Sequence, residues 1–112
     1  MTGAANRRKG AGYELDVAHY LAANGYPDAH RELEKRRDIG DIADGPAGVT
    51  IECKNRSTLD LAGWVNQAEQ AAINTGAAHA AVIIKARGRP VEQSYVVQRF
   101  EDWVDMVKET GR

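Results

Sequence analysis

The sequence has only one cysteine, Cys53, among its 112 residues. A single cysteine excludes a framework of intrachain disulfides and fits a reducing compartment. The histidines are few and scattered, so no structural zinc site is predicted. No apolar run is long enough to span a membrane, and the N-terminus lacks the apolar core of a signal peptide. We therefore expect a soluble cytoplasmic protein with no membrane partner and no small-molecule cofactor.

The chain also lacks an excess of charge of one sign, because its formal net charge is −1. Total charge therefore does not indicate a nucleic-acid partner, but the basic residues are clustered. Such clusters follow phosphates in many nucleic-acid-binding proteins, although solvated loops are the simpler explanation for any one of them. The clusters are Arg7, Arg8 and Lys9; Arg31, Lys35, Arg36 and Arg37; and Lys85, Arg87 and Arg89.

The composition, 43% hydrophobic and 28% charged, is that of one globular domain. Residues 1–9 are predicted to be a flexible basic N-terminal arm, and residues 10–112 a single domain. Apolar periodicity and turn residues predict these elements: a helix at 10–24 before Gly25, a short strand at 29–33, a hairpin of 39–44 and 48–54, a helix at 59–75 before Gly76, strands at 80–86 and 93–98, and a helix at 99–109.

The stretch VTIECK (49–54) alternates apolar and polar residues, as a strand with one apolar face does. Symmetric pairing about the turn at 45–48 places Asp41 opposite Glu52, with Cβ atoms about 4.5–5.5 Å apart. Two such acids destabilise a sheet unless a cation compensates, and Mg²⁺ and Mn²⁺ prefer carboxylate oxygens. Lys54 shares this face, where an ammonium orients water or stabilises phosphate charge. The alternatives are a bulge that sends Asp41 to solvent and an ordinary surface salt bridge of Lys54.

Glu14 is a third acid with an unusual position. In the first predicted helix it lies in the middle of an apolar stripe formed by Tyr13, Val17, Ala18 and Leu21. Because glutamate is rarely buried without a partner, this position indicates a carboxylate presented to the sheet. The alternative is an acid stabilised by the helix dipole near a frayed helix start. Three carboxylates and a lysine suit metal-assisted hydrolysis of a phosphodiester.

The ordered set Glu14, Asp41 and Glu52-x-Lys54 resembles the motif of the PD-(D/E)XK nuclease superfamily, with Gly40 in place of the common proline. Over residues 7–97 the chain is most similar to archaeal and phage Holliday junction resolvases, which share the helix-opening KG, the helix glutamate and a following Gly and Arg. The resemblance implies an α/β, restriction-endonuclease-like α-β-β-β-α-β core, with a mixed central sheet flanked by helices, in a nuclease domain of residues 10–112.

The resemblance also implies a site for Mg²⁺, which Mn²⁺ replaces in such sites. Asp41, Glu52 and the Cys53 backbone carbonyl would hold the metal ion, Glu14 would reach the metal or the water, and Lys54 would act on the nucleophilic water. Gln67 matches a glutamine found near the site in the superfamily, and a helix-surface amide is the alternative. The expected DNA contacts are the first two basic clusters, Lys85, Arg87, Asn55 and Arg56.

The resemblance implies an intracellular endonuclease similar to those that phages encode. Its homodimer would resolve four-way (Holliday) junctions by paired nicks. A second candidate is a nicking, restriction-like or repair nuclease with the same site that acts on duplex, flap or fork DNA. A third is a non-catalytic DNA-binding module that has kept the fold. The complete set of Glu14, Asp41, Glu52 and Lys54 argues against the third, because a decayed site usually loses one member.

Overall fold

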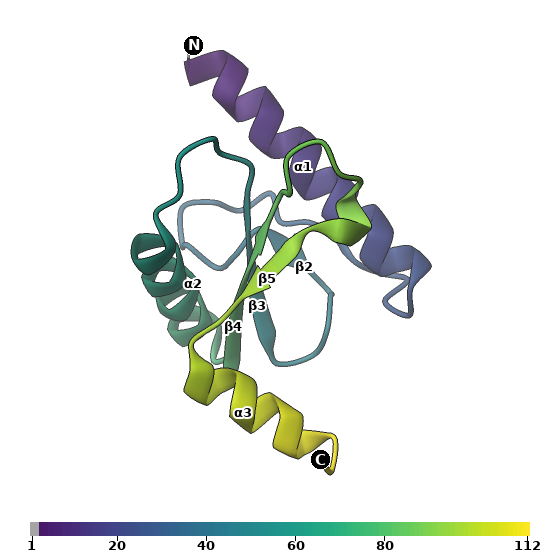
Figure 1. Cartoon of the computed structure of the whole chain (residues 1–112), viewed down its shortest axis with the longest axis vertical. Helices are drawn as coiled ribbons and strands as arrows, with labels where there is room; N and C mark the ends of the chain where they lie inside the picture. Colours follow the sequence, from purple (N-terminus) through teal and green to yellow (C-terminus); the bar gives the residue numbers. More distant parts are fainter. Residues whose placement is uncertain (1–2) are drawn as a thin grey trace.

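The computed structural model describes residues 3–112 and has a mixed α/β fold (Figure 1). No helix within these residues is long and apolar enough to cross a membrane. In chain order the elements are α1 (Gly3–Ala23), β1 (His30–Arg31), β2 (Ile42–Ala43), β3 (Val49–Lys54), α2 (Leu61–Thr75), β4 (His79–Ile84), the short 3₁₀ helix η1 (Val91–Gln93), β5 (Tyr95–Val97) and α3 (Phe100–Glu109).

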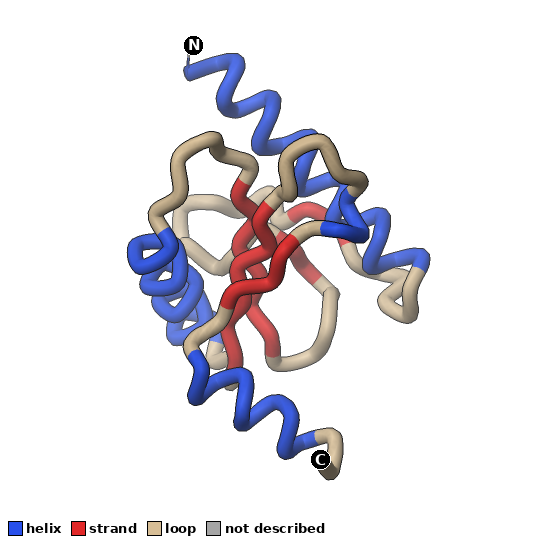
Figure 2. Tube along the Cα trace, viewed as in Figure 1, coloured by secondary structure: helices blue, strands red, loops and turns tan. Residues whose placement is uncertain are grey.

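The main sheet has the strand order β3-β4-β5 and is mixed (Figure 2). β3 runs parallel to β4 in full register, from Val49 beside His79 to Lys54 beside Ile84. β5 runs antiparallel to β4 on the other side. β1 and β2 form a separate two-stranded antiparallel ladder. β3 therefore keeps one edge free of a long partner strand, and the candidate site lies at this edge.

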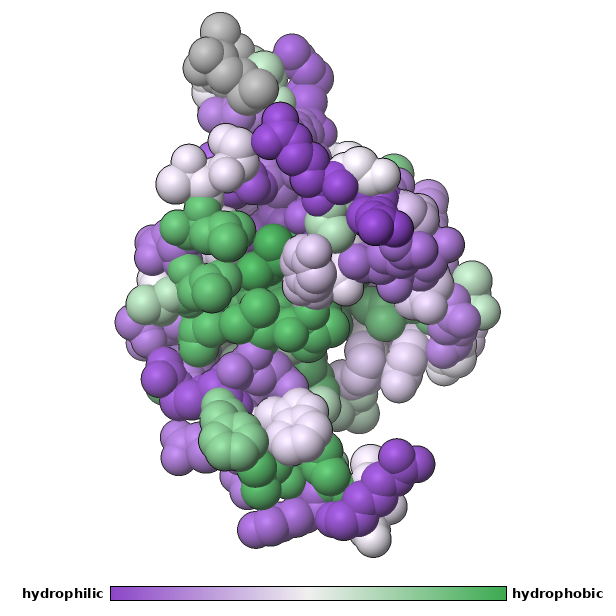
Figure 3. Space-filling model, viewed as in Figure 1, coloured by the Kyte–Doolittle hydropathy of each residue, from purple (hydrophilic) through white to green (hydrophobic). Residues whose placement is uncertain are grey.

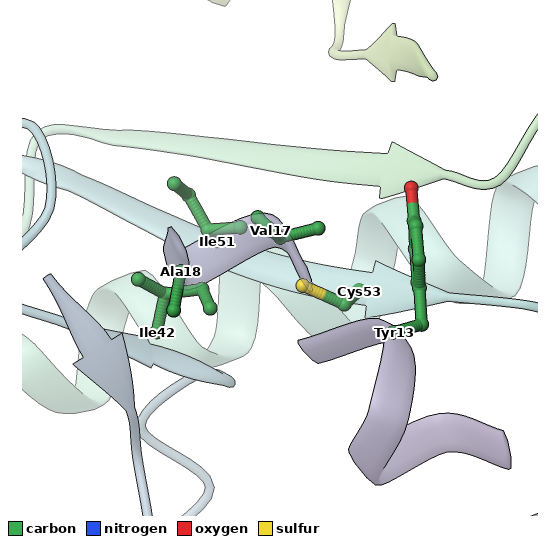
Figure 4. Packing of buried hydrophobic residues seen from close by; sticks show 6 residues of the cluster. All are labelled: Tyr13, Val17, Ala18, Ile42, Ile51 and Cys53. Atoms are coloured by element: carbon green, nitrogen blue, oxygen red, sulfur yellow. The ribbon is translucent and has the colours of Figure 1, made fainter. Parts of the chain in front are cut away.

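Helices cover the two faces of β3. Figure 4 shows Val17 and Ala18 of α1 lying against Ile51 and Ile42, with Cys53 further along β3 toward Tyr13. Because side chains alternate along a strand, Thr50 and Glu52 point to the opposite face. α2 covers that face, where its alanines pack on Ala80, Val82 and Ile84 of β4. Both faces of the strand VTIECK are therefore buried, which the alternating pattern alone does not predict.

Most of the predicted elements are confirmed. The side chain of Asp60 caps α2 by accepting a hydrogen bond from the Gly63 N–H (3.1 Å), and the helix ends at Gly76 with φ 72°. The buried strand is β4, the next predicted strand is β5, and the last helix is α3. The first helix was predicted to end at Asn24, before Gly25, and α1 ends one residue earlier, at Ala23.

Residues 3–9, which the sequence predicts as part of a flexible arm, form the first turns of α1. The first two residues of the predicted arm lie outside the described part of the chain. Alanine, arginine and lysine are good helix formers, and the helix continues through Gly10 and Gly12 because neither adopts a left-handed conformation. In Figure 1 this end of α1 projects beyond the sheet, at the opposite end of the molecule from α3.

The predicted hairpin is also wrong, because β2 pairs with β1 and not with β3. Gly40 has φ 97° and Asp44 has φ 56°, and these left-handed conformations interrupt the extended run that a hairpin strand needs. A single backbone hydrogen bond from the Asp41 N–H to the Ile51 carbonyl (2.8 Å) joins the two segments instead. Asp41 therefore meets β3 from a bend, although the neighbourhood is the one that the sequence predicts.

Candidate active site

All five residues predicted to be catalytic line one open cavity of about 650 Å³. They come from α1, the bend before β2, β3 and α2. The cavity is lined by Glu14, Asp41, Glu52, Lys54 and Gln67, together with Gly3, Asn6, Arg7, Gly10, Ala11, Arg31, Lys35, Cys53, Asn55 and Arg56. The cavity thus joins residues that are far apart in the sequence but meet at the end of β3.

The three acids are arranged around the free edge of β3 and meet in the cavity there. Glu14 comes from α1, which packs on the face of β3 that carries Cys53. Glu52 points to the opposite face, under α2. Asp41 lies between them, because its backbone bonds to the free edge of β3. The sequence predicts Asp41 and Glu52 on one face of a hairpin, whereas the structure arranges the three acids around the free edge of β3.

Asp41 is the central acid of the site. The Cys53 N–H donates a hydrogen bond to Asp41 Oδ2 (2.8 Å), and Lys35 Nζ donates to Asp41 Oδ1 (2.8 Å). Burial opposes ionisation, but the hydrogen bonds from Cys53 and Lys35 outweigh it and lower the pKa of Asp41. Asp41 is therefore the acid of the site that carries its negative charge most readily.

Glu14 is fixed by two cations. Arg31 Nε donates to Glu14 Oε1 (3.0 Å), and Lys35 Nζ donates to Oε2 (3.2 Å). The Glu14 side chain is only 12% exposed, and it lies on the side of α1 that meets β3, where the sequence predicts a carboxylate presented to the sheet. Burial and the nearby charge of Asp41 raise the pKa of Glu14. Arg31 and Lys35, predicted to contact DNA, are engaged here with acids of the site.

Glu52 is the most buried of the acids, with 2% of its surface exposed. Burial, together with the negative charge of Asp41, raises its pKa to about 8. Burial likewise raises the pKa of the neighbouring Cys53 thiol, which excludes a thiolate at neutral pH. A cation that entered beside Glu52 would oppose this effect and favour the ionised carboxylate.

Lys54 reaches the cavity from the end of β3, and α2 fixes its position. Its Nζ donates to Gln67 Oε1 (2.9 Å) and lies 5.9 Å from the centre of the Trp64 ring, within reach of a cation–π contact. The helix that covers Glu52 thus also orients the lysine, and the Gln67 amide takes part in the site. The contact between Trp64 and Lys54 is not predicted by the sequence motif.

Gly40 allows the bend that brings Asp41 to β3. Its φ is 97°, and a Cβ at this position would lie 2.9 Å from Thr50 Cγ2 and 3.2 Å from the Ile51 carbonyl oxygen. Proline has φ near −65° and cannot adopt this conformation. The backbone at position 40 therefore requires glycine and excludes the proline that is common at this place in the PD motif.

A second cavity of about 460 Å³ adjoins the first and shares Asn6 and Arg56 with it. It is lined by Asn6, Lys9, Arg56, Ser57, Thr58, Asp60 and Trp64. The predicted contacts Arg7, Lys9, Asn55 and Arg56 thus border the two cavities. Asn6, Thr58 and Trp64 were not predicted to line the site. The only indication in the sequence is that they lie close along the chain to basic residues or to the strand that ends at Lys54.

The other predicted DNA contacts do not line either cavity. Arg36 lies in the loop before β2 with its side chain 93% exposed, and the Asn74 side chain holds the carbonyl of Arg37 (3.0 Å). Lys85 donates to the carbonyls of Ala86 and Arg89, so it stabilises the turn after β4. Arg8, Arg36, Arg37, Lys85 and Arg87 are therefore not brought to the site.

The donor chemistry of the site fits a hard divalent cation. Glu14 and Asp41 each direct one carboxylate oxygen at the Lys35 ammonium, so two oxygens already share one positive charge. Within residues 3–112, however, no three His, Cys, Asp or Glu side chains are grouped as ligands of one metal ion. Glu14, Asp41 and Glu52 border the same cavity, with Lys35 bound to the first two.

Comparison of the chain with protein-family models, with curated proteins and with solved structures gives no match in any of the three. The interpretation of the site therefore rests on its residues and their geometry.

Proposed function

We propose that this protein is a Mg²⁺-dependent DNA endonuclease with a restriction-endonuclease-like core, and that a homodimer resolves four-way (Holliday) junctions by paired nicks. One observation carries the proposal: three acids, a lysine and a glutamine from four separate segments line one cavity. Such a set suits hydrolysis of a phosphodiester. The resemblance of the motif to PD-(D/E)XK nucleases gives the same activity.

In this proposal Asp41, Glu52, Glu14 and the Cys53 carbonyl would hold the metal ion, and Mn²⁺ would substitute for Mg²⁺. When bound, the ion supplies Lewis-acid stabilisation of the phosphate and a water of lowered pKa. The chain's own residues set the geometry: the Cys53 N–H orients Asp41, and Arg31 orients Glu14.

Lys54 is the residue that acts on the attacking water or on the charge of the phosphate. Gln67 and Trp64 hold its ammonium at the mouth of the cavity, so its position is set before substrate binds.

The two adjoining cavities support a path for the DNA backbone. Arg7 of α1 and Arg56 of the loop after β3 line the acid-containing cavity, and Lys9 and Arg56 line its neighbour. A phosphate that passes between these cations reaches the acids of the site. Trp64 also lines the second cavity, where its ring holds Lys54 beside this path.

The homodimer is supported by apolar surface on β5 and α3. Phe100, Trp103 and Val96 are 76%, 51% and 61% exposed, and with Met106 and Val107 they line a groove of about 560 Å³. Figure 3 shows apolar side chains gathered in the middle of this face and again on α3. A second copy seated here would bury this surface and supply the second active site that paired nicking needs.

The test is a cleavage panel of a four-way junction, a fork, a flap, a linear duplex and a single strand, each with and without Mg²⁺. We expect cleavage of the junction only with Mg²⁺. Asp41→Asn and Glu52→Gln should abolish cleavage but keep junction binding, because phosphate contacts come from arginine and lysine. Asp44→Asn is a matched control, since Asp44 lies in the next turn with its side chain 67% exposed.

Cleavage by Asp41→Asn at the wild-type rate would refute the assignment of the site. Cleavage of forks, flaps or duplex in preference to the junction would favour the second candidate, another nuclease of the same superfamily. Binding without cleavage of any substrate would favour the non-catalytic module.

A further inference from the structure

Lys35 lies between two acids of the site. Its Nζ is 3.2 Å from Glu14 Oε2 and 2.8 Å from Asp41 Oδ1. The other oxygen of each carboxylate is held by a different group: Arg31 Nε donates to Glu14 Oε1 (3.0 Å), and the Cys53 N–H donates to Asp41 Oδ2 (2.8 Å). Each acid therefore has one oxygen anchored and one oxygen directed at the same ammonium.

The acids are fixed, whereas the ammonium has room to move. The side chains of Glu14 and Asp41 are 12% and 14% exposed, and that of Lys35 is 45% exposed. Lys35 comes from the loop between β1 and β2 and has a flexible four-carbon stem that ends in a point charge. Its ammonium is thus able to exchange the two carboxylates for solvent, while Arg31 and Cys53 keep the acids in place.

We propose that Lys35 is an internal counter-cation that occupies the divalent-cation position between Glu14 and Asp41, and that the divalent cation binds by displacing its ammonium. This inference rests on the metal site of the proposed function. Without a divalent cation, Lys35 relieves the repulsion between the two acids. With one, the released ammonium stays at the wall of the cavity, beside the proposed path of the phosphates.

The first test measures Mn²⁺ binding without DNA, by electron paramagnetic resonance or isothermal titration calorimetry at fixed pH and ionic strength. Lys35→Met removes the competing charge and should bind Mn²⁺ about tenfold more tightly than the wild type, which corresponds to ~1.4 kcal/mol. Lys35→Arg keeps a competing cation and should stay close to the wild type. Arg36→Met is the matched control, because it removes the same charge from a neighbouring side chain that does not touch these acids.

The second test measures thermal unfolding and does not depend on activity. In the presence of a chelator, Lys35→Met should unfold at a lower temperature than the wild type, because Glu14 and Asp41 lose their shared cation. Saturating Mn²⁺ should close this gap, since the ion replaces the missing ammonium and stabilises the folded state by mass action. Arg36→Met should respond to Mn²⁺ as the wild type does.

The outcomes separate this inference from the proposed function. Equal Mn²⁺ affinities of the wild type and Lys35→Met would overturn the role of Lys35 and leave the nuclease proposal standing. Absence of Mn²⁺ binding to every variant would overturn both, because the cation would not enter even an emptied position. Tighter binding by Lys35→Met, lost again in Lys35→Met/Asp41→Asn, would support the inference even if no DNA were cleaved by the wild type.

Discussion

Replacement of Gly40 by alanine should destabilise the protein more than a left-handed backbone conformation alone explains. The φ of 97° is strained for any residue with a side chain. The new Cβ would lie 2.9 Å from Thr50 Cγ2 and 3.2 Å from the Ile51 carbonyl oxygen. The Thr50 methyl cannot easily move away, because Thr50 is buried and its hydroxyl bonds to that of Thr75 (3.1 Å).

The magnitude follows from these two contributions. Backbone strain costs about 1–3 kcal/mol, and overpacking against a fixed neighbour costs about 1–3 kcal/mol more. Loss of entropy from the unfolded chain offsets about 0.4–1 kcal/mol of this sum. We therefore expect Gly40→Ala to lower the free energy of unfolding by about 2–4 kcal/mol, a large part of the stability of a small domain.

Two other glycines separate the contributions in urea unfolding. Gly48 has φ 76° with no atom within 4 Å of an added Cβ, so Gly48→Ala measures strain alone, about 1–2 kcal/mol. Gly10 lies inside α1 with equally open space, so Gly10→Ala should stabilise by up to about 1 kcal/mol. Equal losses for Gly40→Ala and Gly48→Ala would refute the close approach of Gly40 to β3, and with it our account of how Asp41 is placed.

Two further predictions concern α3. Hydrogen bonds from the His79 imidazole to Asp102 (2.5 Å) and Glu109 (2.6 Å) raise the His79 pKa. These bonds therefore stabilise the folded state fully below the unfolded pKa of about 6.5, and this stabilisation is lost as the pH rises through the higher folded pKa. The wild-type urea midpoint should therefore fall as the pH rises above about 6.5, and that of His79→Gln should not. Parallel pH profiles of the two proteins would contradict this prediction. If α3 forms the dimer interface, the wild type should sediment as a dimer at micromolar concentration and Trp103→Glu as a monomer. Ile73→Glu is the control and should stay dimeric, because Ile73 lies on α2 and is 72% exposed. A dimeric Trp103→Glu would place the interface elsewhere.

The sequence predicted the neighbourhood of Asp41 and Glu52 through a hairpin that does not form. Local turn residues indicate that the chain reverses near 45–48, and the reversal does occur. Which strand the segment pairs with depends on β1, more than ten residues away in the sequence, and on the left-handed backbone at Gly40. Pairing between segments that are distant in the sequence leaves no local pattern. The prediction therefore placed Asp41 near Glu52 correctly but assigned the wrong partner strand to the segment that carries Asp41.

The roles of single side chains in the site were predicted unevenly for a similar reason. Glu14 was recognised because an acid within an apolar stripe conflicts with the pattern around it. Lys35 lies in a charged loop where nothing distinguishes it from Arg36, yet Lys35 turns back to the acids and Arg36 points to solvent. His79 is separated from its acidic partners by a strand and a helix, so its ion pairs have no sequence signature.

The distribution of charge at the edge of β3 explains why the acids of this site differ. Arg31 and Lys35 bind Glu14 and Asp41 directly, whereas Lys54 is turned to Gln67. Glu52 is therefore left buried beside a negative Asp41, and its pKa is raised to about 8, while the pKa of Asp41 is lowered. A protein that needed these acids only for stability would gain from apolar residues in a buried position such as that of Glu52. A cation that entered this site would favour the ionised form of Glu52 and would compete with Lys35 for Glu14 and Asp41, which is the behaviour that the proposed function requires.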